Sequence, residues 1–216
     1  MIFRRHSELE GKHALLSASS WRWVNDDIES LTKRICSQYL ADIGTILHDV
    51  ARKYIKHRIK LNKYDKKSVM LELVEHGIPA MVIDTINFDS MYENFMLYVN
   101  DAVAFKMTPE VVLRYTNNFF GTADAIRYDE DSHFLRIHDY KSGTTPAHME
   151  QLMIYVALFC LEYGIKPSSI QCELRIYQLS EPVVYEPTAE EISHIIGQII
   201  TFDNFMTNNM GGGVMP

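Results

Sequence analysis

The spacing of apolar residues along the chain changes at about residue 108. Before this point, apolar residues recur every three or four positions from about Gln38 to Leu61 and again over 68–105, which predicts amphipathic helices. After it, β-branched and aromatic residues alternate with polar ones, which predicts strands. The three expected strands are 111–115, 119–128 and 133–141.

The last third of the chain predicts further alternation of helix and strand. Residues 148–164 form an apolar helical run that ends at Gly164, and residues 169–179 alternate as a half-buried strand does. Thr188 and Glu191 have the spacing of a capping box and predict a final helix, followed by a loose tail at about 208–216. The order predicts an α/β fold with a mixed sheet flanked by helices, a helical N-terminal part and a single domain over residues 1–216, in which 68–105 form a helical insertion.

Composition supports one domain with a sizeable core. The chain has 216 residues, of which 47% are hydrophobic. It contains no uncharged apolar run of about 18 residues and no apolar segment at the start long enough for a signal peptide, so we expect no membrane span and a cytoplasmic location. The cysteines, Cys36, Cys160 and Cys172, are scattered, as reduced core thiols are.

Charge is distributed unevenly. The net charge is −7, yet residues 52–67 hold eight of the 21 lysines and arginines and one acid, Asp65. Such a stretch is either a solvated helix face or a surface that binds phosphates. The residues we consider for DNA binding are Arg52, Lys53, Lys56, Arg58 and Lys60.

Candidate chemistry lies in the expected hairpin. If strands 119–128 and 133–141 pair through a turn at 129–132, Asp124 lies opposite Asp139, and two such carboxylates repel each other unless a cation lies between them. Oxygen ligands of this kind suit Mg²⁺ or Mn²⁺. Lys141 lies two residues after Asp139 and therefore on the same face, where it would stabilise charge on a phosphate. The alternative is an ordinary ion pair at the end of a strand.

These residues resemble the PD-(D/E)xK nuclease superfamily, and specifically its RecB-like branch, which includes phage exonucleases and CRISPR-associated nucleases. The resemblance covers about residues 15–164. It depends on five short segments in the same order as in that branch: an S-x-S with Ser17 and Ser19, a G-T-x-x-H with Gly44, Thr45 and His48, "GTAD" at 121–124, "DYK" at 139–141, and a Q-x-x-x-Y with Gln151 and Tyr155. It implies a restriction-endonuclease-like fold.

The resemblance also implies a role for each matching residue. Asp124, Asp139 and Lys141 would be catalytic, and His48 would join the two aspartates and the Tyr140 carbonyl as a metal ligand. Gln151 and Tyr155 would support the active site or touch DNA. Glu110 matches only loosely, and a strand or helix start explains it equally well. His138 faces away from Asp139 and is interpreted as non-catalytic.

The differences from the family also matter. Members with an iron–sulfur cluster carry four cysteines at set places, which this chain lacks, so we expect no cluster. No phosphate-binding loop of the helicase type is present either. We therefore expect a stand-alone nuclease domain or one subunit of a larger assembly.

The resulting hypothesis is a metal-dependent DNA nuclease, specifically an exonuclease that processes DNA ends in phage-type recombination or repair. Its expected partners are DNA and, as a further candidate, a single-strand annealing or other recombination protein; if phage-encoded, it would act in a bacterial host cell. Two alternatives stay open, namely a catalytically silent member that binds DNA or protein, and an endonuclease selective for sequence or structure. Oligomerisation is also left open.

Overall fold

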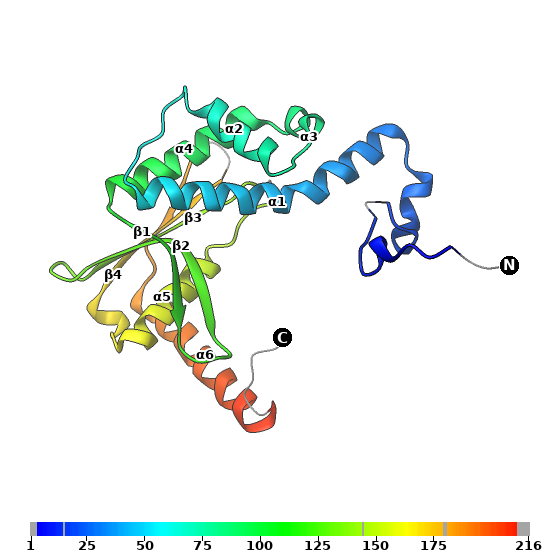
Figure 1. Ribbon diagram of the computed structural model, residues 1–216. Coiled ribbons are helices and arrows are strands. Elements are labelled where there is room, and N and C mark those ends of the chain that lie inside the picture. The colour runs from blue at the N-terminus through cyan, green and yellow to red at the C-terminus, as the bar shows by residue number, and fades with distance from the viewer. Residues whose placement is uncertain (1–3, 15, 144, 179–180, 211–216) are drawn as a thin grey trace.

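The computed structural model describes residues 4–14, 16–143, 145–178 and 181–210. In these residues the protein is an α/β structure, with helices on both faces of a mixed sheet and a helical N-terminal part (Figure 1). The α-helices are α1 (Ile28–Lys56), α2 (Lys66–Glu75), α3 (Ala80–Thr85), α4 (Phe88–Ala104), α5 (Glu150–Tyr163) and α6 (Ala189–Met210). The strands are β1 (Thr108–Arg114), β2 (Phe120–Asp129), β3 (Phe134–Tyr140), β4 (Gln171–Tyr177) and β5 (Val183–Tyr185). Three short 3₁₀ segments lie at Ser7–Leu9, Ala18–Asn25 and Pro167–Ser169.

The sheet has the strand order β1-β2-β3-β4-β5. β1, β2 and β3 pair antiparallel, β3 pairs parallel with β4, and β5 pairs antiparallel with β4. The predicted turn between β2 and β3 is confirmed, because Asp129 accepts hydrogen bonds from the backbone and the hydroxyl of Ser132. The parallel pair requires a crossover, which α5 supplies. β3 is thus the central strand, buried on both faces from Ile137 to Tyr140.

Helix α1 is longer at its start than the sequence pattern predicted. It begins at Ile28 rather than near residue 38, because the Asp27 carboxylate accepts a hydrogen bond from the backbone N–H of Ser30 and caps the first turn. It ends at Lys56, before residue 61, and Arg58 adopts a left-handed backbone with φ of 59°. Its second half lies over the sheet, while its first half extends away toward the N-terminal segment (Figure 1).

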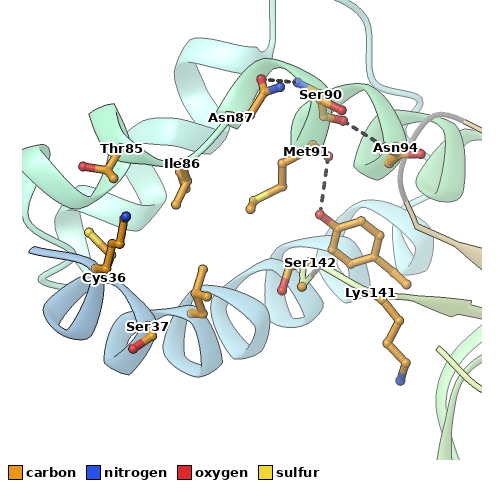
Figure 2. Close-up of a pocket in the computed structure, with 14 residues that line it drawn as sticks. Cys36, Ser37, Thr85, Ile86, Asn87, Ser90, Met91, Asn94, Lys141 and Ser142 are labelled. Atoms are coloured by element: carbon orange, nitrogen blue, oxygen red, sulfur yellow. Dashed lines mark hydrogen bonds between the residues drawn. The ribbon is translucent and has the colours of Figure 1, made fainter. Parts of the chain in front are cut away.

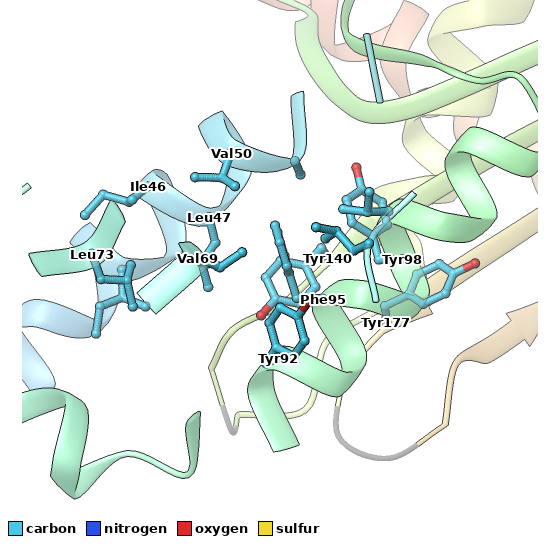
Figure 3. Packing of buried hydrophobic residues seen from close by; sticks show 14 of the residues in the cluster. Ile46, Leu47, Val50, Val69, Leu73, Tyr92, Phe95, Tyr98, Tyr140 and Tyr177 are labelled. Carbon is cyan, nitrogen blue, oxygen red and sulfur yellow. The ribbon is translucent and has the colours of Figure 1, made fainter. Parts of the chain in front are cut away.

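An aromatic cluster joins α4 to the sheet. Tyr140 of β3 stacks on Tyr98 with ring centroids 5.8 Å apart and meets Phe95 edge-on at 5.4 Å (Figure 3). Tyr98 in turn meets Tyr177 of β4. The helices expected as an insertion at 68–105 therefore share one core with α1. Of these helices, α4 packs against β3, the strand that carries Asp139.

The opposite face of the sheet is covered by α5, and α6 packs against α5 (Figure 1). The expected capping box is confirmed, because Thr188 and Glu191 exchange backbone and side-chain hydrogen bonds at the start of α6. The tail expected at 208–216 begins later than that, since α6 continues to Met210, and residues 211–216 lie outside the described residues. Among the described residues, no helix combines the length and apolar character that crossing a membrane requires.

Candidate metal centre

Two aspartates lie side by side on neighbouring strands. Ala125 of β2 pairs with His138 of β3, and the same register places Asp124 opposite Asp139, as the hairpin predicted. The backbone N–H of Tyr140 donates a hydrogen bond to the Asp124 carboxylate, with 3.0 Å between the nitrogen and Oδ2. That bond fixes the Asp124 side chain against the end of β3.

His48 and Glu110 complete a cluster with Asp124. Each of the three offers a ligand atom, and these atoms all lie within 4.8 Å of one another. His48 Nδ1 lies 3.5 Å from Asp124 Oδ2. Helix α1 supplies the histidine and strands β1 and β2 supply the acids, so the group forms where three elements meet. The resemblance implied that His48 and Asp124 lie close together, and the structure places them so.

Glu110 belongs to this cluster, although its sequence match was loose. It lies inside β1 rather than before the first strand, and its backbone has φ of 53°, in the left-handed region that residues other than glycine rarely adopt. Such a conformation costs about 1–3 kcal/mol, so its surroundings must hold it there. At this residue the ladder between β1 and β2 is interrupted. Pro109 and Val111 pair with residues of β2, whereas none of the described β2 residues is paired with Glu110 in the strand register.

Burial changes the protonation of these groups. Loss of solvent raises the pKa of Asp124 to about 6, against the opposing effect of the Tyr140 N–H. Burial, together with the charge of Asp124, raises the pKa of Asp139 to about 6. Burial also raises the pKa of Glu110 and lowers that of His48. Burial thus favours the protonated form of the acids and the neutral form of the imidazole. A bound cation would favour the ionised acids and would bind the imidazole in its neutral form.

Lys141 contacts the second aspartate rather than the cluster itself. Its Nζ lies 3.0 Å from each oxygen of Asp139 and donates a hydrogen bond to Oδ1, while Oδ2 is buried without a hydrogen bond. Nζ also donates to the Gln151 side chain at 3.0 Å, and Gln151 donates to the Tyr155 hydroxyl. The predicted Q-x-x-x-Y pair therefore reaches the site through Lys141.

Two glycines permit the close packing around the site. A side chain at Gly121 would place its Cβ 2.9 Å from the Tyr155 ring, so this glycine lets α5 lie against β2. At Gly44, a Cβ would lie 3.1 Å from the Ser142 hydroxyl oxygen, which brings the segment after β3 close to α1. Both distances are shorter than ordinary van der Waals contact. A larger residue at Gly121 would require the Tyr155 ring to shift, and one at Gly44 would require the Ser142 hydroxyl to move by a few tenths of an ångström.

The basic stretch after His48 has mixed roles. Arg52 pairs with Asp49 at 3.1 Å. Its charge partly offsets the burial that raises the pKa of Glu110, which places Arg52 near the cluster. Lys53 pairs with Glu72 at 3.4 Å. Arg58 donates hydrogen bonds to the backbone carbonyls of Met107 and Lys106, so it joins α1 to the start of β1. The Arg58 guanidinium thus has a structural role, and its contact with DNA stays a prediction. Lys56 and Lys60 are exposed.

Other predicted features lie away from the cluster. Ser17 and Ser19 hydrogen-bond each other in the N-terminal segment, which lies beyond the far end of α1 (Figure 1). His138 is fully buried on the opposite face from Asp139, where its Nδ1 lies 3.2 Å from the Tyr177 hydroxyl. Burial lowers the pKa of His138 to about 3, which agrees with a neutral, non-catalytic side chain.

A comparison with protein families found a match that covers most of the chain. A family model described as a protein of unknown function (DUF2800) matches residues 13–178, which include every residue of the cluster and Lys141. A comparison with curated proteins found no match.

Proposed function

We propose that the chain, which belongs to the DUF2800 family, is a metal-dependent nuclease that hydrolyses phosphodiester bonds in DNA and degrades it from an end. The observation that carries the proposal is the cluster of His48, Glu110 and Asp124, with ligand atoms within 4.8 Å, beside the Asp139–Lys141 pair. The proposal includes the restriction-endonuclease-like interpretation of the fold. It is supported by an antiparallel pair β2–β3 that carries the acids and a crossover helix that supports the lysine.

The donor set fits a divalent cation of intermediate hardness. Several carboxylates and one imidazole suit Mg²⁺ or Mn²⁺, and the imidazole favours Mn²⁺. Three acids with raised pKa values lie close together, and Asp139 Oδ2 is buried without a hydrogen bond, so this oxygen is a further candidate ligand atom. His48, Glu110, Asp124, Asp139 and the Tyr140 carbonyl would hold the ion. When bound, it would supply Lewis acidity and lower the pKa of a bound water.

The chain's own residues would orient the substrate. Lys141 has its ammonium held between Asp139 and Gln151, so it is preorganised to face negative charge that develops on a phosphate. Its side chain is 32% exposed, and a phosphate can therefore reach it. Arg52 and the exposed lysines of the basic stretch would contact the phosphates of the DNA backbone, which gives little sequence preference.

Digestion of three DNA forms tests the proposed function. With Mn²⁺ or Mg²⁺, we expect the enzyme to degrade linear end-labelled DNA and to spare a covalently closed circle, with single-stranded DNA as the third substrate. The Asp139→Asn protein, purified in the same way, controls for contaminating nucleases. Cleavage of the circle would indicate an endonuclease instead. Binding without cleavage of any form would indicate a silent member of the fold.

The salt dependence of DNA affinity tests the basic stretch. Lys56→Glu together with Lys60→Glu should weaken binding and lower the log–log salt slope by about 2, since each lost phosphate contact removes about 0.9. Lys53 and Arg58 are left intact because they have protein partners. Binding is measured by fluorescence anisotropy between 50 and 200 mM salt, about the range over which such contacts are screened.

The matched control for that experiment reverses two exposed lysines elsewhere, Lys12 and Lys166. This control has the same net charge as the test variant, so it separates a local contact from the overall charge of the protein. Equal salt slopes for the two double variants would show that the basic stretch is only a solvated helix face.

A further inference from the structure

The outer half of the β1–β2 hairpin continues beyond the metal cluster with one face uncovered. Side chains of a strand alternate between the two faces of the sheet. A Cβ at Gly121 would lie 2.9 Å from the Tyr155 ring, so Gly121 faces α5. Phe120 therefore faces the other way, as does Asp124, which meets His48 of α1. The hairpin extends away from α1 and toward α6, so α1 leaves this face open at its outer end (Figure 1).

Four side chains on the open face lead away from the cluster, and we call them the hairpin strip. Val112 of β1 pairs with Thr122 of β2, and Arg114 pairs with Phe120. All four are exposed, Val112 by 56% and Phe120 by 55%. Because a strand rises about 3.3 Å per residue, the Cα atoms of Phe120 and Asp124 lie about 13 Å apart. The strip thus begins beside the cluster and ends about 13 Å from it.

The outer end of the strip places a positive charge beside an aromatic ring. Residues opposite each other in an antiparallel pair have Cβ atoms about 5 Å apart, as Arg114 and Phe120 do. The Arg114 guanidinium donates a hydrogen bond to the Asn117 side chain, and none of the carboxylates in the described residues forms an ion pair with it. Glu162 accepts a hydrogen bond from the Arg114 backbone N–H, and Asp203 accepts two from the hairpin turn. The charge of Arg114 is therefore open to an anion from solution.

The cavity at the end of β3 does not continue the site in the same way. It has a volume of about 420 Å³ and lies between α1, the end of α3 and the start of α4 (Figure 2). Figure 2 shows the Lys141 side chain leading away from the other lining residues, and its Nζ is bound to Asp139 and Gln151. A phosphate at Lys141 therefore lies outside this cavity, whereas the hairpin strip extends directly from Asp124.

An exposed ring beside an arginine suits single-stranded nucleic acid. Every base has a flat face on which an aromatic side chain can stack, and arginine neutralises a backbone phosphate. The bases of a duplex are already stacked on both faces, so a duplex would offer the strip only its phosphates. The strip is also continuous with the cluster at which a phosphodiester would be hydrolysed, which favours a nucleic-acid strand over a protein partner.

We infer that the hairpin strip holds the single-stranded part of the DNA substrate, with one base stacked on Phe120 and a phosphate at Arg114. The inference rests on the proposed function, because it takes the metal cluster as the place of cleavage. A stacked strand rises about 3.4 Å per nucleotide, so the base on Phe120 lies about four nucleotides or fewer from the cleaved bond. The enzyme would therefore bind and cleave ends with a single-stranded overhang in preference to blunt duplex ends.

The experiment compares a short single strand with a blunt duplex of the same sequence. Affinities are measured by fluorescence anisotropy in EDTA, so that no cleavage occurs. Phe120→Ala should weaken single-strand binding by about 10-fold, the scale for losing one stacked base, and should leave duplex binding unchanged. Phe120→Trp keeps a ring and should bind the single strand as the wild type does. Phe205→Ala is the matched control, because Phe205 is 61% exposed on α6 and lies two residues from Asp203, on the side of α6 away from the hairpin turn.

Arg114→Gln tests the phosphate contact. It should weaken single-strand binding and lower the log–log salt slope by about 0.7, the value for one phosphate contact on a single strand. Arg22→Gln removes the same charge at an exposed arginine of the N-terminal segment and should leave the slope unchanged. Thermal unfolding verifies that each variant is folded.

The outcomes separate the hairpin strip from the nuclease activity. Single-strand binding that survives Phe120→Ala, or that falls equally for the single strand and the duplex, overturns the inference even if the wild type cleaves DNA. A selective loss in Phe120→Ala, in a protein that cleaves no DNA with Mg²⁺ or Mn²⁺, supports the strip and contradicts the proposed function. A wild type that binds no single strand also overturns the inference, and dimers that Phe120→Ala separates in sedimentation would then assign the strip to a second copy of the chain.

Discussion

Asp139→Asn is expected to abolish cleavage and, at the same time, to make the metal-free protein more stable. The activity should fall by about 10³ or more, because Asp139 holds Lys141 and belongs to the acids that would bind metal. The free energy of unfolding should rise because burial and repulsion from Asp124 both destabilise an ionised Asp139, whereas asparagine carries no charge. A residue retained for the fold alone would show the opposite change in stability.

The pH dependence of that gain follows from the raised pKa. Below about pH 3 the carboxyl group is protonated in both the folded and the unfolded protein, so the wild type and Asp139→Asn should be equally stable. As the pH rises from 3.8, the ordinary value, through about 6, the value in the fold, the unfolded state ionises first and the wild type loses stability. The shift corresponds to about 3 kcal/mol at most. We expect a gain of about 1–3 kcal/mol at pH 7.5, because asparagine also loses the pairing with Lys141.

Urea unfolding in EDTA at pH 4.5 and pH 7.5 measures the gain, and cleavage of linear DNA measures the activity. Asp131→Asn is the matched control, because Asp131 lies exposed in the turn between β2 and β3. It should leave both quantities unchanged. Normal cleavage by Asp139→Asn would remove Asp139 from the site, and a destabilised variant at pH 7.5 would show that its pairing with Lys141 outweighs its burial.

Local patterns predicted those parts of the fold in which neighbouring residues determine the structure. The β2–β3 hairpin follows from alternating residues on both sides of a turn that Asp129 closes with its own side chain. The capping box of Thr188 and Glu191 likewise lies within one helical turn. Strand β5 was not predicted, because Val183–Tyr185 is only three residues long, and its strand conformation depends on pairing with β4.

The candidate site was predictable where sequence spacing determines spatial distance. Asp124 and Asp139 lie opposite each other because the hairpin register depends on the turn between them. Glu110 was placed only loosely, because a left-handed residue inside a strand leaves no trace in the hydrophobic pattern. The structural role of Arg58 was not predictable, because its partners, the carbonyls of Lys106 and Met107, lie about 50 positions further along the chain and are brought near only by the fold.

Lys141→Ala is expected to lower the cleavage rate by about 10²–10³ while leaving metal affinity unchanged or raised. Lys141 would stabilise charge on the phosphate and does not bind metal, so removal of its positive charge cannot weaken the ion's own ligands. The loss of a competing cation beside Asp139 should even favour metal binding. No concentration of Mn²⁺ should restore the rate. Lys166→Ala, at an exposed lysine outside the basic stretch, is the control for a general loss of charge.

His48→Ala should behave in the opposite way, and the contrast makes the Lys141 result specific. His48 contributes a ligand atom to the cluster with Glu110 and Asp124, so its loss should weaken metal binding, and added Mn²⁺ should recover part of the activity. Calorimetric Mn²⁺ titration and cleavage rates at saturating metal distinguish the two variants. Near-normal rates in Lys141→Ala would mean that "DYK" at 139–141 is an ordinary ion pair at the end of a strand. The short distance between Lys141 and Asp139 would then reflect packing at the end of β3, and the nuclease proposal would lose its central residue.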